Sequence, residues 1–174
     1  MEVSVFGLGK ARCADVSGPW FRGDSVPLKE FKSPVPHNYA IYFARDADFA
    51  RGFGAFLHTV HFKKACIFDA DREDFKPFLA KADRMVQADP SEPAWGEFAS
   101  TLRYVWEEEM AADGDPALAM KLAIDKASDA THFGMAKNLL GTLGYDGYLF
   151  SRDGTTELVL MNHKVVVVDS VEAV

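Results

Sequence analysis

The stretch from Leu143 to Phe150 (LGYDGYLF), followed after a short polar turn by Thr156 to Asn162 (TELVLMN), is the most informative part of this chain. Both segments have strand length and apolar content, and Asp153-Gly154 between them is a strong β-hairpin signal. Glu157 opens the second strand, which is otherwise apolar. Its carboxylate can reach a cleft while the residues after it anchor the backbone, so the pattern predicts a positioned acceptor. The bland alternative is an exposed glutamate beside a turn.

The chain before residue 70 predicts strands separated by one short helix. Asp46 is suited to be the N-cap of that helix, which Gly52 and Gly54 end. The expected order is β-β-α-β-β, with strands at Trp20–Arg22, Tyr39–Phe43, Ala55–Lys63 and Cys66–Phe68.

Residues 72–128 change to apolar positions at helical spacing, which predicts a helical insertion of three segments. Prolines at positions suited to helix starts separate the segments. A further helix is expected from about Asp129 to Leu143, with Gly144 as its C-cap glycine. Together with a last strand at Val165–Asp169, these elements predict a single domain over residues 1–174.

Composition restricts the class of protein. The formal net charge of -7 argues against direct nucleic-acid binding, because neutralising phosphates needs an excess of clustered Lys and Arg. Two cysteines, Cys13 and Cys66, argue against a disulfide framework and fit a reducing compartment. No apolar run approaches the length of a membrane span. We therefore expect a cytoplasmic protein with no membrane partner. Delivery into a host or target cell, where the protein would act in the cytoplasm, is the other option.

Three segments in a fixed order carry a resemblance to a known family. They are a strand with Arg22, an aromatic strand with Tyr42 and Phe43 that leads into a helix, and the strand with Glu157. In this order and spacing the chain resembles the ADP-ribosyltransferase superfamily. A similar layout occurs in phage- and plasmid-borne transferases, including small anti-CRISPR proteins that modify a host protein.

The resemblance covers residues 19–69 and 131–170. It implies an α+β fold with a split β core, in which two small sheets form an NAD cleft, and with the helical lobe as an insertion. The Glu157 carboxylate would hydrogen-bond the ribose of NAD and stabilise an oxocarbenium-like transition state. The same logic operates in glycoside cleavage, where a fixed carboxylate offsets positive charge that develops on the sugar.

Arg22 is the candidate for holding the dinucleotide, because its planar fork can form paired hydrogen bonds with a phosphate or a ribose. The small Gly23 beside it would let a ligand approach the backbone. The residues alone allow a second interpretation, in which Arg22 is a surface arginine paired with Asp24 or Glu30.

Three aromatic residues complete the set of cofactor-binding candidates: Tyr42, Phe43 and Phe53. Strand alternation lets only one of Tyr42 and Phe43 face the cleft, and the other is expected in the core. Phe53 is a candidate for stacking on the ligand, with core packing as the alternative. An arginine on the first strand belongs to one class of the superfamily and an aromatic second strand to the other, so the chain is mixed.

We do not expect a metal site. His58 and His61 are three residues apart, and in a strand they point to opposite sides, while His37, His132 and His163 are isolated.

The resemblance implies an NAD-dependent mono-ADP-ribosyltransferase that modifies a macromolecule, expected to be a protein, and releases nicotinamide. Two alternatives stay open, an NAD glycohydrolase and an inactive relative that blocks a protein partner.

Overall fold

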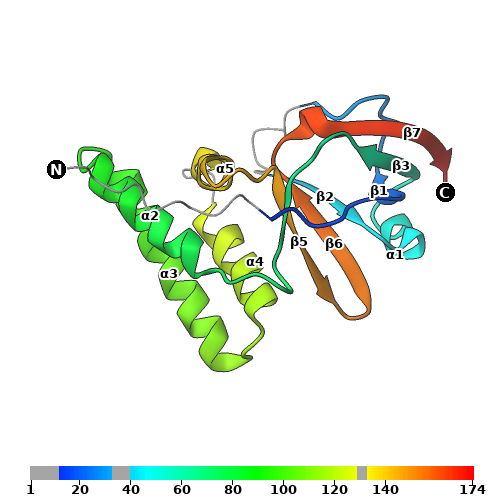
Figure 1. The fold of residues 1–174 in the computed structure, drawn as a ribbon. Coiled ribbons are helices and arrows are strands. Elements are labelled where there is room, and N and C mark those ends of the chain that lie inside the picture. The colour runs from blue at the N-terminus through cyan, green and yellow to red at the C-terminus, as the bar shows by residue number, and fades with distance from the viewer. Residues whose placement is uncertain (1–11, 33–39, 129–132) are drawn as a thin grey trace.

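The helices and strands of a computed structural model confirm the α+β class; the structure describes residues 12–32, 40–128 and 133–174 (Figure 1). The strands are β1 (Trp20–Asp24), β2 (Ile41–Ala44), β3 (Phe56–Phe62), β4 (Ile67–Asp69), β5 (Gly147–Arg152), β6 (Thr155–Leu160) and β7 (Val166–Ala173). The helices are α1 (Ala47–Arg51), α2 (Lys76–Ala88), α3 (Pro93–Ala112), α4 (Pro116–Ala127) and α5 (Phe133–Thr142), and a 3₁₀ turn at His163–Val165 precedes β7.

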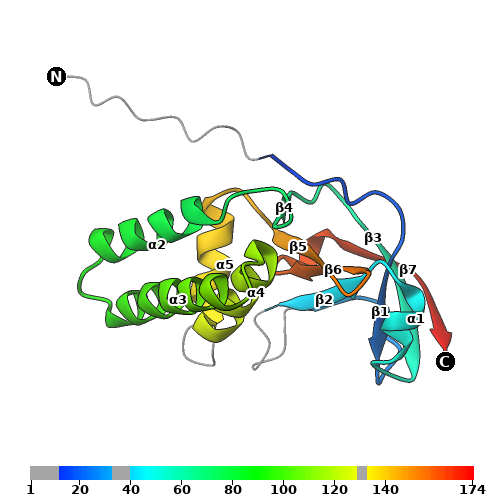
Figure 2. The same ribbon diagram turned by 90° about the horizontal axis from the view of Figure 1, so that it is seen from below.

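The strands form one sheet in the order β4-β5-β6-β2-β1-β3-β7. Pairing between β1 and β2, in the middle, is limited to one residue pair, Phe21 with Ala44. Every other pair of neighbouring strands is matched over at least three residues. The sheet therefore consists of two halves, β4-β5-β6-β2 and β1-β3-β7, that meet at a seam (Figure 2). Where the sequence predicted two small sheets, strand pairing is continuous through this seam.

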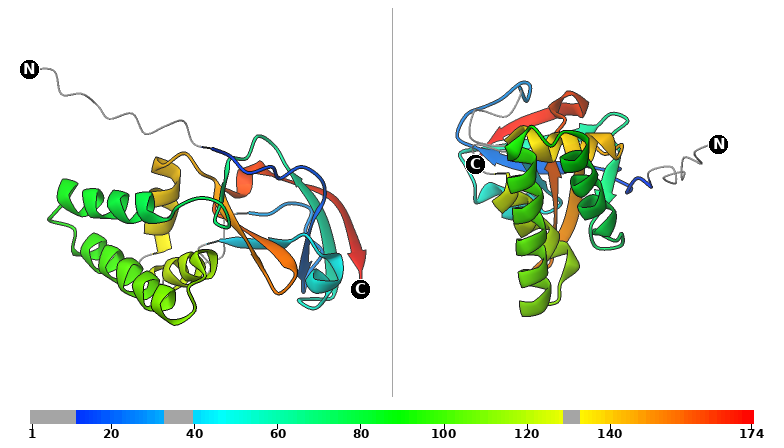
Figure 3. Two further views of the ribbon diagram at one scale, coloured as in Figure 1. Left: turned by 60° about the horizontal axis from the view of Figure 1, so that its bottom comes forward. Right: turned by 90° about the vertical axis from the view of Figure 1, so that its left-hand side faces the viewer.

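The predicted helical insertion is present as α2, α3 and α4, which gather with α5 on the side of the molecule away from α1 (Figures 1 and 3). Pro93 and Pro116 stand at the starts of α3 and α4, and Asp115 caps α4 by accepting hydrogen bonds from two backbone N–H groups. Gly144, with φ of 88°, ends α5 as predicted. The start expected for α5, residues 129–132, lies outside the described residues.

Two apolar cores lie on the two faces of the sheet. The larger one packs α2–α5 against the face that carries Tyr148, Phe150 and Val159. The smaller one includes Trp20 and Phe43 together with the alternate residues of β5 and β6, such as Leu149 and Leu158. This alternation explains why β5 and β6 read as continuous apolar runs, since both of their faces are covered.

The β5–β6 hairpin forms as the sequence predicted. Asp153 and Gly154 have φ values of 51° and 82°, the left-handed pair that a tight two-residue hairpin turn requires. One detail differs. Strand β6 begins at Thr155, so Glu157 is its third residue and not its first.

Helix α1 is fixed against β1 at very short range. Asp46 caps the helix, as predicted, by accepting a hydrogen bond of 2.8 Å from the N–H of Phe49. The turn after the helix lies directly on β1, where a methyl group built on Gly54 would lie 2.2 Å from the carbonyl carbon of Asp24. Gly54 is therefore required for the turn to approach the strand.

The sequence argued against a disulfide framework, and the structure contains one disulfide. Cys13 and Cys66 form a disulfide with a Cα–Cα distance of 4.8 Å. The backbone N–H of Ala14 also donates to the carbonyl of Ile67, at 2.8 Å, so the chain ahead of β1 runs beside the start of β4. Sequence gave no sign of this proximity, because 53 residues separate the two cysteines. Separately, no helix among the described residues is long and apolar enough to cross a membrane.

Candidate functional site

A cavity of about 420 Å³ opens at the seam, with walls from β1, β2, α1 and β6. Its volume is in the range of sites for small molecules and cofactors. The structure brings every site residue predicted from the sequence to this cavity, namely Arg22, Gly23, Tyr42, Phe43, Phe53 and Glu157. The order of motifs along the chain therefore identified one place in the fold.

Glu157 is a half-buried carboxylate on the wall of this cavity. Strand pairing places it directly opposite Ala44 on β2 and Phe150 on β5, with all three side chains on the face that the helical lobe covers. Among the described residues, nothing forms a hydrogen bond or an ion pair with its side chain. A buried carboxylate normally has such partners, so this one is available to a ligand.

Burial raises the pKa of Glu157 above its ordinary value of 4.5, because removal from water disfavours the charged form. Lys121 and then Arg152 act in the opposite direction, and Asp125 adds to the rise. A carboxyl group with a perturbed pKa in a cavity is a common property of functional sites.

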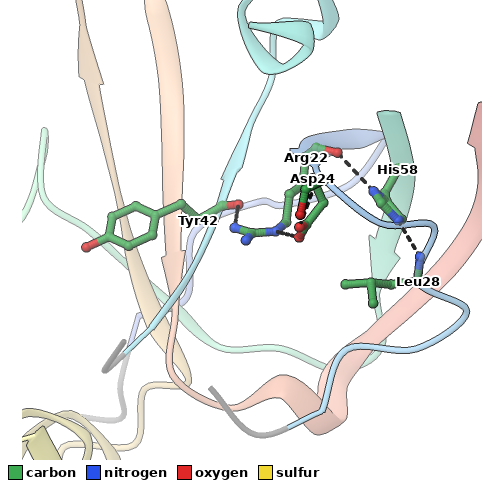
Figure 4. A network of polar contacts seen from close by, with 6 residues as sticks. Arg22, Asp24, Leu28, Tyr42 and His58 are labelled. Atoms are coloured by element: carbon green, nitrogen blue, oxygen red, sulfur yellow. Dashed lines mark hydrogen bonds and ion pairs between the residues drawn. The ribbon is translucent and has the colours of Figure 1, made fainter. Parts of the chain in front are cut away.

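Arg22 is held by two partners within the protein, which Figure 4 shows together. Its Nε donates to Oδ2 of Asp24 at 3.1 Å, and its Nη1 donates to the backbone carbonyl of Tyr42 at 3.2 Å. Its guanidinium carbon is 5.9 Å from the centre of the Phe31 ring. The pairing with Asp24 that the sequence left open is therefore present, while Glu30 pairs with Lys32.

Tyr42 and Phe43 point to opposite faces of β2, as alternation predicted. Phe43 borders the cavity, but its side chain is only 2% exposed and its ring packs edge-on against Phe31 and Phe62. It is a core residue. The Tyr42 ring points away from Arg22 (Figure 4), and its hydroxyl donates to Oδ1 of Asp125 on α4 at 3.3 Å.

Phe53 is 65% exposed, so the alternative of core packing is wrong for this residue. Its ring meets that of Phe49 edge-on, with 5.1 Å between the ring centres, and both residues line the cavity. Exposed aromatic rings at the mouth of a cavity offer flat apolar surface to a ligand. From the sequence, Phe49 was predicted only to lie in a helix. The structure shows that it lines the cavity, because α1 packs against β1.

Gly23 serves a purpose other than the one predicted. A methyl group built on it would lie 2.1 Å from the carbonyl oxygen of Ala50, so the space beside Gly23 is taken by α1. The close approach that a glycine permits here is made by the protein's own backbone. Gly23 borders the cavity, and contact with a ligand stays a prediction.

The imidazole of His58 fixes the segment after β1. It is fully buried, its Nε2 accepts a hydrogen bond of 2.8 Å from the N–H of Leu28, and its Nδ1 lies 3.2 Å from the carbonyl of Arg22 (Figure 4). Since a backbone N–H can only donate, Nδ1 is the nitrogen that donates to Arg22. His61 is half-buried and pairs with Asp169, and alternation along β3 places it on the side opposite His58.

Within the described ranges, no group of three potential metal ligands comes together. His37 and His132 lie outside those ranges. Sequence reasoning also missed Lys121 and Asp125 of α4, which lie near Glu157. Their spacing of four residues was the only signal, and it is common on any helix surface.

No family model and no curated protein matches the chain. A structural comparison finds a solved structure described as the crystal structure of an anti-CRISPR protein, with a TM-score of 0.40 and 16% sequence identity. The match covers 90% of this chain and 95% of that chain. A likeness at this TM-score carries no argument about the site.

Proposed function

We propose that this protein is an NAD-dependent mono-ADP-ribosyltransferase that binds NAD in the cavity at the seam and transfers ADP-ribose to a protein target, with release of nicotinamide. In this proposal the two halves of the sheet are the split core of the ADP-ribosyltransferase fold. The seam between β1 and β2 forms the floor of the NAD cleft, and α2, α3 and α4 are an insertion in that core.

One observation carries the proposal: a half-buried carboxylate without a partner among the described residues, on the wall of a cavity whose mouth is aromatic. A carboxylate fixed in this way is suited to stabilise positive charge that develops on a ribose as the bond to nicotinamide breaks. Glu157 would take this role. Phe53 would stack on an exposed ring of the dinucleotide. Tyr42, which lies on the same face of the sheet as Glu157, would form a wall beside the nicotinamide of NAD.

The test is incubation of the purified protein with labelled NAD, with and without a cell lysate. Glu157→Gln keeps the shape of the side chain and removes its charge, so we expect it to fold and to lose both nicotinamide release and transfer of label. Glu172→Gln, on the exposed end of β7, is the matched control and should retain both. Turnover by Glu157→Gln at the wild-type rate would remove Glu157 from the chemistry.

Two other functions are separated by the same assay. Release of nicotinamide without label on any macromolecule, in the presence of lysate, indicates an NAD glycohydrolase. An inactive relative that binds a protein partner is favoured by one observation, the engagement of Arg22 by Asp24 and by the Tyr42 carbonyl. In that case the wild-type protein turns over no NAD and forms a stoichiometric complex with a protein from the lysate.

A further inference from the structure

Helix α4 of the insertion lays two charged side chains over the face of the sheet that carries Glu157. Lys121 and Asp125 are four residues apart, so they lie on the same side of the helix. They form an ion pair, and their side chains are only 23% and 28% exposed. Ion pairs at this depth are less screened by water than pairs on the surface.

Lys121 and Glu157 are both neighbours of Phe150. The Lys121 ammonium is 5.9 Å from the centre of the Phe150 ring. Phe150 is itself the cross-strand neighbour of Glu157, and directly opposite side chains on one face have Cβ atoms about 5 Å apart. The ammonium and the carboxylate therefore lie near the same buried ring, and Lys121 acts on the charge of Glu157.

Asp125 fixes the position of this lysine. Besides its ion pair with Lys121, it accepts the hydrogen bond from the hydroxyl of Tyr42 on β2. The contacts thus run from the sheet at Tyr42, through Asp125, to Lys121, and return to the sheet at Phe150. A flexible lysine is held in one place by partners from two elements.

We propose that Lys121 is a positioning residue of the site, which favours the carboxylate form of Glu157 inside the cavity. Burial alone favours the protonated acid, which could not stabilise a cation. A nearby ammonium opposes this effect of burial without occupying the carboxylate in a hydrogen bond. The helical insertion is then part of the site, and not only a surface for a partner.

Other charged groups also face Glu157 and enter the same balance. Arg152, from the end of β5, lowers its pKa, and Asp125 raises it. Asp46, Asp48 and Asp153 line an adjoining cavity that Glu157 shares. Of the positive charges, Lys121 lowers the pKa of Glu157 more than Arg152 does.

The experiment is NMR titration of the side-chain carboxyls in ¹³C-labelled protein, with Glu157 assigned from Glu157→Gln. In Lys121→Met, which keeps the stem over Phe150, we expect the pKa of Glu157 to rise. In Asp125→Asn we expect it to fall, because a negative neighbour of the carboxyl group is removed. Lys126→Met, on the exposed side of the same helix, is the control and should leave the value unchanged.

An unchanged Glu157 pKa in Lys121→Met, with a native circular dichroism spectrum, would overturn the proposal. Equal shifts in Lys121→Met and Lys126→Met would overturn it as well. The catalytic consequence rests on the proposed function: the acid limb of the pH profile of nicotinamide release should move by the shift that NMR measures. The titration itself needs no NAD, so its outcome stands even when no nicotinamide is released under any condition.

Discussion

Replacing Gly54 by alanine should disrupt the docking of α1, and the size of the effect follows from the backbone geometry. The new methyl group would lie 2.2 Å from the Asp24 carbonyl carbon, whereas ordinary contacts begin at 3.4 Å. The strand and the turn must separate by roughly 1.2 Å, and no rotamer change can relieve a clash with backbone. Overpacking of this kind costs about 1–3 kcal/mol, or more when the backbone must shift.

A matched control exists in the same chain. Gly96, in α3, has open space where a methyl group would be placed, so Gly96→Ala should stabilise the helix by about 0.5–1 kcal/mol. For a chain of this length, 1 kcal/mol corresponds to a change in melting temperature of roughly 2–4 °C. The two substitutions add the same methyl group and are expected to have opposite signs.

Urea unfolding, followed by circular dichroism, measures both free energies of unfolding. We expect Gly54→Ala to unfold at lower urea concentration than the wild type, and Gly96→Ala at higher concentration. A Gly54→Ala variant as stable as the wild type would refute the contact between the turn and β1. It would also remove the basis for placing Phe53 over the cavity, since Phe53 immediately precedes Gly54.

Three further predictions concern stability. The disulfide links residues that are 53 apart, so the double substitution Cys13→Ser/Cys66→Ser should lower the free energy of unfolding by about 4 kcal/mol, through the larger chain entropy of the unfolded state. A urea midpoint equal to that of the oxidised protein would contradict this prediction. Burial raises the Glu157 pKa, so the folded state keeps the proton of this carboxyl group to higher pH than the unfolded chain does. The contribution of Glu157 to stability should therefore fall as pH rises above 4.5, and the stability of Glu157→Gln relative to the wild type should grow over that window in pH-dependent melts. Asp115→Ala removes the α4 cap and should cost about 1 kcal/mol in urea unfolding.

The sequence was sufficient where local chemistry determines structure. The Asp153-Gly154 turn, the Asp46 cap and the glycine after α5 all depend on neighbours within a few residues, and each is present. The opposite orientation of Tyr42 and Phe43 follows from strand alternation in the same way. These features need no knowledge of what packs against them.

The remaining features depend on contacts between distant segments. The Cys13–Cys66 bond requires the chain ahead of β1 to run beside β4, and the space at Gly23 is filled by a helix that comes later in the chain. Lys121 joins Glu157 only because the insertion folds back over the sheet. The order of the motifs was enough to name six residues near one cavity. It was not enough to say which of the six direct their side chains into that cavity.

Arg22 has a structural role at the seam in addition to its proposed role in ligand binding. Because a single residue pair joins β1 and β2, the hydrogen bond from Arg22 to the Tyr42 carbonyl is an additional link between the two halves of the sheet. An anionic ligand that draws the guanidinium away from β2 breaks this hydrogen bond, so the affinity for such a ligand and the closure of the seam compete for one side chain. By thermodynamic linkage, a substitution that tightens the seam then weakens the binding of such a ligand. The arginine is thus a thermodynamic link between the integrity of the sheet and occupancy of its cavity.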